Sequence, residues 1–144
     1  MAQPTLPAIP TLSGSFTQWA NKKIEVVEYI GKRILIEGGK MLLIGEKKFG
    51  KSRIMIQTAI ELALGIPWLG SVIVPEPRRV LLFSMEGSEG EHVERLQVYK
   101  HAYGKLPSDD MAKLIVLPWM PLVERQGAEI FEREVALFKP EVVL

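Results

Sequence analysis

The feature that most constrains this chain of 144 residues is the segment 41–52, MLLIGEKKFGKS. A short apolar run leads directly into Gly45-x-x-x-x-Gly50-Lys51-Ser52. The two glycines allow the backbone to turn and to bring consecutive N–H groups together. A helix that begins near Lys51 would point its free N–H groups and the positive end of its dipole at the same place. This order of strand, glycine-bounded loop and helix is typical of a loop that binds phosphate.

The expected partner of such a loop is a nucleotide with Mg²⁺. We expect the Lys51 ammonium to neutralise the terminal phosphates and the Ser52 hydroxyl to bind Mg²⁺. The residues predicted to bind the nucleotide are Gly45, Glu46, Lys47, Lys48, Phe49, Gly50, Lys51, Ser52 and Arg53. The simpler alternative is a glycine turn before an ordinary helix, with Lys51 in solvent. The apolar run before the loop and the amphipathic helix after it favour the phosphate loop.

The composition is that of an ordinary globular domain, with 47% hydrophobic and 24% charged residues. A chain of 144 residues can form one domain with a substantial core and is short for two. Because cysteine is absent, disulfides, cysteine metal sites and cysteine nucleophiles are excluded. No apolar run is long enough to span a membrane, and residues 1–14 lack the features of a signal peptide. We therefore expect a cytoplasmic protein.

The net charge of +1 conceals an uneven distribution along the chain. Residues 21–53 contain nine Lys or Arg and four Glu, whereas residues 84–144 contain seven Lys or Arg and eleven Asp or Glu. A basic half around the phosphate loop suits a nucleotide or a nucleic acid. Two differently solvated faces explain the same distribution equally well, so charge alone does not choose between these possibilities.

Hydrophobic periodicity, glycine and proline divide the chain into elements. Residues 1–20 are expected to be a tail or linker, with a helical turn at 15–20 that docks onto the domain. The predicted elements are a strand pair within 22–37, strands at 40–44, 79–84, 114–117 and 141–144, and helices at 51–64, 88–103 and 127–138. The run at 79–84 has no polar alternation, which is typical of a parallel strand buried on both faces. The alternation of strands and helices along the chain predicts an α/β fold with a mostly parallel sheet.

Four stretches in order over residues 38–144 carry a family resemblance: GGKMLLIGEKKFGKS, ALGIPWLG, RRVLLFSMEGSEGEHVERL and KPEVVL. They resemble the RecA-like P-loop ATPases and, within them, the RepA-like hexameric replicative helicases. The loop is specific for the superfamily, and the spacing of the other stretches points to the RepA-like group. The resemblance implies a three-layer P-loop NTPase fold over residues 21–144 and ATP with Mg²⁺ as ligands. It also implies single-stranded DNA as a partner and assembly into a homo-oligomeric ring of six subunits.

The resemblance also gives a role to Glu86, which follows the apolar run at 79–84. In RecA-like ATPases a glutamate just beyond the second strand positions and activates the attacking water. An acid at the carboxyl end of a parallel strand also lies where such folds carry out chemistry. The alternatives are a surface acid in a turn, or Glu89, whose place in the next helix better suits a contact with the helix dipole. Lys51 and Glu86 are therefore the expected catalytic residues.

The resemblance implies further parts that the sequence does not contain. In the family the strand corresponding to KPEVVL ends in an aspartate that holds Mg²⁺ through water, whereas this sequence ends at Leu144. We therefore expect the amino-terminal portion of an ATPase domain, incomplete at its carboxyl end. An alternative is a nucleotide-binding fragment deficient in hydrolysis, or a regulatory or assembly module. A third possibility is a kinase or a KaiC-like signalling ATPase, which has the same loop without the helicase role.

Two residue types outside the loop could be mistaken for functional groups. His92 and His101 lie on one predicted helix without an acid or serine arrangement, so they are expected at the surface. Trp68 and Trp119 lie in proline-flanked connectors. Stacking on a base is conceivable for these indoles, but packing against the edge of the sheet is the stronger expectation.

Overall fold

Helices and strands alternate along the chain in nearly the order that the sequence predicts. The structure is a computed structural model that describes residues 13–23, 25–117 and 125–144. Its elements are α1 (Phe16–Ala20), β1 (Glu28–Ile30), β2 (Leu35–Ile36), α2 (Lys51–Leu64), β3 (Val80–Ser84), α3 (Glu89–Tyr103), β4 (Ala112–Val116), α4 (Arg125–Phe138) and β5 (Val142–Val143).

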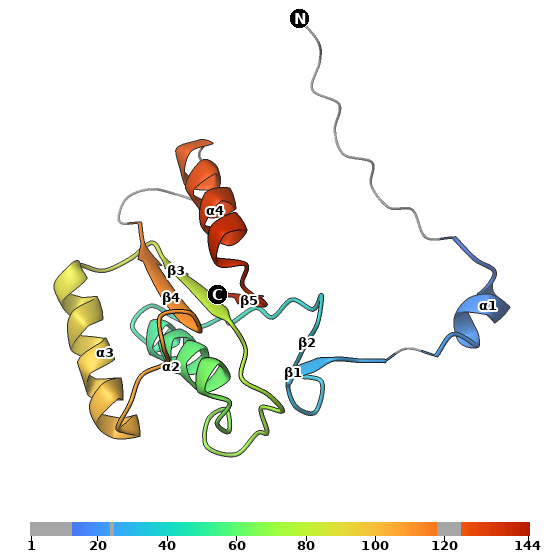
Figure 1. The fold of residues 1–144 in the computed structure, drawn as a ribbon, viewed down its shortest axis with the longest axis horizontal. Helices are drawn as coiled ribbons and strands as arrows, with labels where there is room; N and C mark the ends of the chain where they lie inside the picture. The colour runs from blue at the N-terminus through green and yellow to red at the C-terminus, as the bar shows by residue number, and fades with distance from the viewer. Residues whose placement is uncertain (1–12, 24, 118–124) are drawn as a thin grey trace, which may run out of the picture.

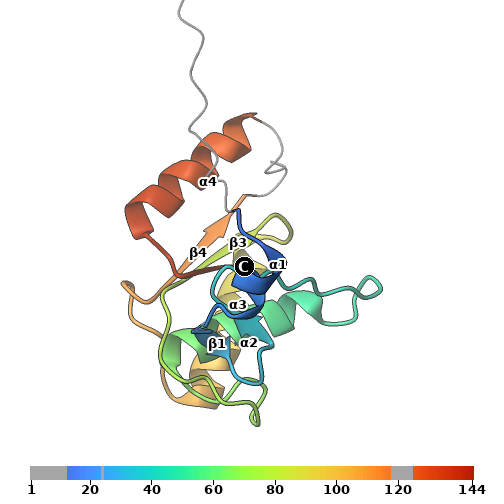
Figure 2. The same ribbon diagram turned by 90° about the vertical axis from the view of Figure 1, so that its right-hand side faces the viewer.

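The central sheet is parallel and has the strand order β4-β3-β5. Its middle strand, β3, is the apolar run that was predicted to be buried on both faces, and its two faces meet different helices. Val80 and Leu82 join the core that α2 and α3 cover, whereas the Phe83 ring lies 5.1 Å from the Phe131 ring of α4, centroid to centroid. The sheet therefore lies between α4 on one side and α2 with α3 on the other (Figures 1 and 2). This arrangement confirms the predicted three-layer α/β fold of the P-loop NTPase kind.

Helix α2 forms because its apolar residues recur with helical spacing and bury one face. Ile56, Ala59 and Ile60 are at most 5% exposed and pack against β3. The helix ends at Gly65, whose φ of 66° lets its N–H reach the carbonyls of the last turn. A Cβ at Gly65 would also lie 2.8 Å from the Pro77 ring, so both backbone conformation and space require glycine there.

Helix α3 has the ends that its sequence predicts. The Ser88 hydroxyl accepts from the Glu91 N–H and the Glu91 carboxylate accepts from the Ser88 N–H, so the two residues form a capping box. Gly104 ends the helix in the left-handed conformation. Tyr99 and Tyr103 pack against the core.

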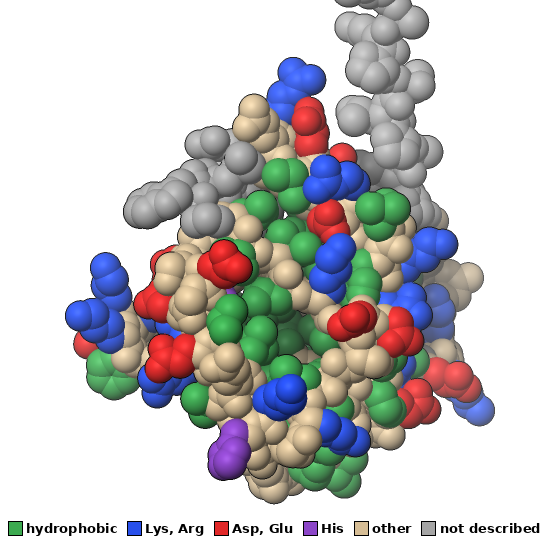
Figure 3. Space-filling view, turned by 60° about the vertical axis from the view of Figure 1, so that its left-hand side comes forward, with side chains coloured by type: hydrophobic (Ala, Val, Ile, Leu, Met, Phe, Trp, Pro, Cys, Tyr) green, Lys and Arg blue, Asp and Glu red, His purple; other side chains and the backbone are tan. Residues whose placement is uncertain are grey.

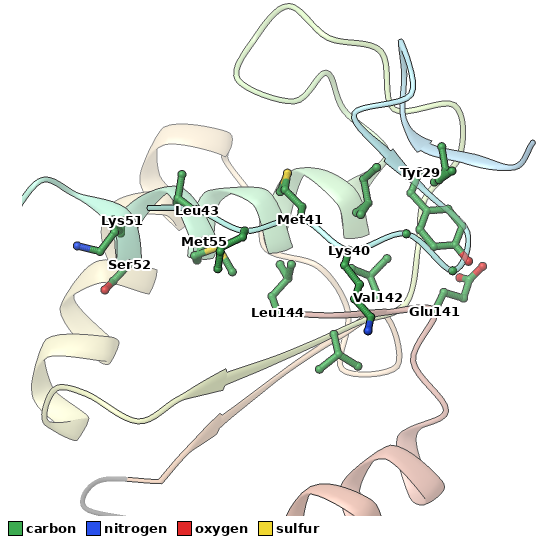
Figure 4. A pocket seen from close by; sticks show the side chains of 16 residues that line it. Tyr29, Lys40, Met41, Leu43, Lys51, Ser52, Met55, Glu141, Val142 and Leu144 are labelled. Atoms are coloured by element: carbon green, nitrogen blue, oxygen red, sulfur yellow. The ribbon is translucent and has the colours of Figure 1, made fainter. Parts of the chain in front are cut away.

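The predicted strand at 40–44 is absent from the structure. The segment pairs with no strand in the described parts of the chain, and Leu42 and Ile44 are 81% and 82% exposed. A groove of about 620 Å³ separates it from β5, with Met41 on one side and Leu144 on the other (Figure 4). Apolar residues form a strand only where a neighbouring strand accepts their backbone hydrogen bonds, and no strand among the described residues pairs with this segment.

The amino-terminal elements are formed partly as predicted. Strands β1 and β2 are the expected pair and run antiparallel. The helical turn exists as α1, but it does not dock, because Phe16 is 97% exposed and Trp19 is 43% exposed. Trp68 packs against the core, and its indole N–H donates to the Thr58 hydroxyl of α2 at 2.8 Å. Trp119 lies outside the described residues.

One face of the molecule is hollowed at its centre. In the space-filling view, apolar side chains are exposed within the hollow and acidic and basic side chains surround it (Figure 3). No helix in the part of the chain that the structure describes is both long and apolar enough to pass through a membrane.

Candidate functional site

The loop between the extended segment 40–44 and α2 is turned by two left-handed residues. Lys48 has a φ of 69° and Gly50 a φ of 83°. The predicted need for glycine is therefore confirmed at position 50. Gly45 differs, because its φ is not positive and a Cβ there would make only ordinary contacts of 3.7–3.8 Å with the Lys51 side chain. In this conformation the turn does not require a glycine at position 45.

The amino end of α2 is open to an anion. Gly50 is the N-cap residue and provides no side-chain hydrogen bond, and the first turn contains no acid. The first backbone hydrogen bond of the helix runs from the Ile54 N–H to the Gly50 carbonyl at 3.0 Å. The N–H groups of the residues between them, Lys51 to Arg53, therefore stay available, with the positive end of the helix dipole behind them. Such an end attracts phosphate or carboxylate.

Lys51 folds back over the loop that precedes it. Its Nζ donates to the Gly45 carbonyl at 2.8 Å and to the Glu46 carbonyl at 2.7 Å. These bonds hold the ammonium beside the open helix end. A phosphate group offers a charged acceptor, which makes a stronger hydrogen bond than a neutral carbonyl. The Lys51 side chain is thus placed where it can exchange loop carbonyls for phosphate oxygens.

Ser52 and Glu86 come together at a second, smaller cavity of about 240 Å³. Ser52 and Met55 line it from α2, and Glu86 and His92 line it from the carboxyl end of β3 and the start of α3. Ser52 also lines the larger groove that Lys51 borders (Figure 4). It therefore borders both hollows. The structure therefore places the loop serine and the predicted acid at one cavity, at the edge of the sheet where α/β folds bind their ligands.

The main chain of Glu86 is held from two sides. Its carbonyl oxygen accepts from the Ser84 hydroxyl at 3.0 Å and from the His92 Nε2 at 3.0 Å. Gly87, with a φ of 89°, then turns the chain into α3. The Glu86 side chain is exposed and makes no ion pair or hydrogen bond within the described residues. Its carboxylate is thus available at the cavity while its backbone is fixed.

The surface position predicted for His92 is wrong. His92 is 3% exposed and His101, as expected, is exposed. The capping box explains the difference, because Ser88 as N-cap makes His92 the fourth residue of the helix. A side chain at that position folds back against the chain before the helix. This position relative to Ser88 was the sequence signal that could have identified His92.

The remaining predicted loop residues do not converge on a site through their side chains. Glu46, Lys47, Lys48 and Arg53 are exposed, and Phe49 is 74% exposed. The Arg53 carbonyl accepts from the Tyr99 hydroxyl at 2.9 Å, which ties α2 to α3. What these residues offer a nucleotide is backbone N–H groups rather than charged side chains.

The described residues contain no group of three acidic or histidine side chains that could hold a metal ion. Beside the open helix end, the Ser52 hydroxyl provides an oxygen that can bind a metal ion, and Ser52 lines both hollows. Mg²⁺ commonly keeps several waters and binds through one or two protein oxygens and the phosphates of a nucleotide. The donor set therefore fits Mg²⁺ that arrives with a nucleotide, and it does not fit a metal held by protein alone.

Comparison with known proteins bears on the identity of this arrangement. Residues 5–139 match the family model described as an AAA domain. No curated protein and no solved structure matches the chain. The family match covers most of the sequence and includes the loop, α2, β3, Glu86, α3 and β4. The chain therefore belongs to the AAA domain family, and it is an ATP-binding module of the P-loop ATPase type.

Proposed function

We propose that this chain is the ATP-binding core of a RepA-like helicase or a related DNA-replication ATPase that hydrolyses ATP with Mg²⁺. The observation that carries the proposal is the shared cavity of Ser52 and Glu86 beside Lys51 and the open end of α2. The sequence resemblance supports the RecA-like domain over residues 21–144, the single-stranded DNA partner and the ring of six subunits. The cytoplasmic location is proposed from the composition and the apolar pattern of the sequence. ATP binding itself follows from the family.

The chemistry is a displacement at the terminal phosphorus of ATP. The loop N–H groups bind the phosphates, and Lys51 leaves the Gly45 and Glu46 carbonyls to neutralise their charge. Glu86 orients a water molecule and takes its proton as the new P–O bond forms. The bond between the terminal phosphorus and the bridging oxygen breaks, and ADP and phosphate leave. Mg²⁺, when bound at Ser52 and the phosphates, neutralises charge that develops on the oxygens.

The test compares variants of the whole 144-residue chain in nucleotide binding and in phosphate release. Lys51→Ala should abolish tight binding of a fluorescent ATP analogue, whereas Lys100→Ala, at an exposed position of α3, should leave its Kd within about twofold. Glu86→Gln should keep the affinity and reduce turnover by about 100-fold or more. Micromolar affinity retained in Lys51→Ala would refute the phosphate loop, and unchanged turnover in folded Glu86→Gln would remove Glu86 from catalysis.

A second candidate is a binding module that holds nucleotide without turning it over, in a regulatory or assembly role. The segment 40–44 favours it, because this segment pairs with no strand among the described residues, and a loop without such an anchor is less preorganised for phosphoryl transfer. ATP hydrolysis by the purified chain separates the two candidates. Phosphate release that Lys51→Ala abolishes supports the ATPase, and tight ATP binding without release supports the binding module.

A further inference from the structure

We propose that His92 is a positioning residue that fixes Glu86 at the cavity that Glu86 shares with Ser52. The inference rests on the proposed function, because it concerns the role of Glu86 in ATP hydrolysis. His92 comes from the first turns of α3, and Glu86 comes from the end of β3, so the contact also joins these two elements.

The hydrogen bond defines the state of the imidazole ring. The Glu86 carbonyl can only accept, so the His92 Nε2, 3.0 Å away, carries the hydrogen. The Nδ1 is also buried, and it has no partner among the described residues. His92 therefore acts here as a buried donor to one backbone oxygen.

The chain around Glu86 leaves little freedom for another arrangement. A Cβ at Gly87 would lie 2.8 Å from the Glu91 Oε2 and 3.4 Å from the His92 Nε2, so the turn is closely packed on α3. The Ser88 N–H donates to the same Glu91 oxygen at 2.8 Å. The Glu86 carboxylate itself is held by no partner in the described parts of the chain, so its backbone anchors determine where it lies.

Loss of the His92 donor should therefore affect turnover more than binding. A misplacement of about 1 Å at a reacting group can reduce a rate by about 100-fold. Because the Ser84 hydroxyl still holds the Glu86 carbonyl, we expect a smaller loss, about tenfold in kcat. The phosphate loop and Lys51 lie on another element, so the affinity for ATP should change less than about twofold.

The experiment uses three histidine variants of the full chain. His92→Leu removes the donor and should lower kcat about tenfold with KM nearly unchanged. His92→Gln keeps an N–H donor at the end of a side chain of similar length, and it should restore most of the rate. His101→Leu, at an exposed position of the same helix, should behave as wild type. Circular dichroism and the Tm identify variants that fail to fold.

A double-mutant cycle separates positioning from a general structural effect. If His92 acts through Glu86, His92→Leu combined with Glu86→Gln should lose no more turnover than Glu86→Gln alone. Affinity for ADP with aluminium fluoride, which mimics the transition state, should fall about tenfold in His92→Leu while affinity for ADP alone is retained. This second measurement does not depend on turnover.

The outcomes distinguish the inference from the proposed function. Additive losses in the double variant, or equal losses in His92→Leu and His92→Gln, would overturn the role of His92 and leave the ATPase proposal intact. An unchanged rate of ATP hydrolysis in Glu86→Gln would overturn the catalytic role of Glu86, and the positioning role of His92 with it. If His92→Leu does not fold, Ser84→Ala removes the other donor to the same carbonyl. When Ser84→Ala is combined with the folded variant His92→Gln, the affinity for ADP with aluminium fluoride should fall. An unchanged affinity would refute the positioning of Glu86 through its carbonyl.

Discussion

Replacement of Tyr103 by phenylalanine tests how the buried carboxylate of Glu61 is accommodated. Glu61, on α2, is 2% exposed, and it accepts from the Tyr103 hydroxyl at 2.7 Å, the Gln57 amide at 2.8 Å and the Leu69 N–H at 2.8 Å. The described residues place no cation in contact with it, so these three donors stabilise its charge. Tyr103→Phe removes the shortest of the three hydrogen bonds and keeps the ring.

The size of the effect near pH 7 follows from the charge on the acceptor. A hydrogen bond to a charged group contributes about 1.5–3 kcal/mol. We therefore expect Tyr103→Phe to lower the free energy of unfolding by about 2 kcal/mol. Separately, burial and then the hydrogen bond to Glu61 raise the pKa of Tyr103 from 10.0 to about 12, which affects stability only at alkaline pH.

The sign of the pH dependence follows from the raised pKa. Above pH 10 the unfolded chain loses the Tyr103 proton while the folded chain keeps it, so stability falls as the pH rises from about 10 through 12. Burial also raises the pKa of Tyr29 and of Tyr99. The difference between wild type and Tyr103→Phe cancels their contributions, so the variant should lose stability less steeply over that range.

The assay is urea unfolding followed by circular dichroism, first near pH 7 and then across the alkaline range. Tyr99→Phe is the matched control, because the Tyr99 hydroxyl donates to a neutral carbonyl, that of Arg53, and its loss should lower stability by only about 0.5–1 kcal/mol. The m-value should not change in either variant. A loss in Tyr103→Phe no greater than in Tyr99→Phe, or the same alkaline slope as wild type, would refute the reasoning.

Two further predictions concern the ends of β5 and α2. The Glu141 carboxylate accepts from the Arg79 N–H at 3.0 Å and from the Arg78 guanidinium at 2.8 Å, and these bonds lower its pKa. The stabilisation by the ionised Glu141 carboxylate is present above about pH 4.5 and is lost as the pH falls through the lowered pKa. Glu141→Gln should therefore make the free energy of unfolding depend less on pH in the acid range. An unchanged pH dependence there would contradict this. Gly65→Ala should cost about 2–4 kcal/mol in thermal or urea unfolding, because left-handed strain adds to the contact with Pro77. Gly70→Ala, equally left-handed but with open space, should cost only about 1–2 kcal/mol, and equal losses would show that the contact has no effect.

Local signals predicted the two helices that frame the site. The ends of α2 and α3 depend on Gly65, on the capping box of Ser88 with Glu91, and on Gly104, all within a few residues of the bonds they make. The left-handed Gly50 before α2 is local in the same way. Interactions between near neighbours in the chain need no information about the rest of the fold, so a sequence pattern is sufficient to predict them.

Signals for strands and for burial were less reliable, because they depend on distant partners. The run at 40–44 is as apolar as β3, yet only β3 has strands on both sides and helices on both faces. A capping box at the start of α1 stabilises this helix, but its aromatic residues, Phe16 and Trp19, are exposed. His92 was expected at the surface because no acid or serine arrangement accompanies it in the sequence, whereas the packing of the turn at Gly87 against α3 determined its burial.

The sequence by itself determined the glycine-bounded loop and the helix that follows it, because glycine conformation and helix ends are properties of short segments. The acid after β3 was predicted through the family resemblance. Only the tertiary structure decided that Ser52 and Glu86 line one cavity and that His92 holds the Glu86 carbonyl. Both depend on how α2 and α3 pack on the sheet beside β3, and packing of segments far apart in sequence is determined by burial in the folded chain rather than by local pattern.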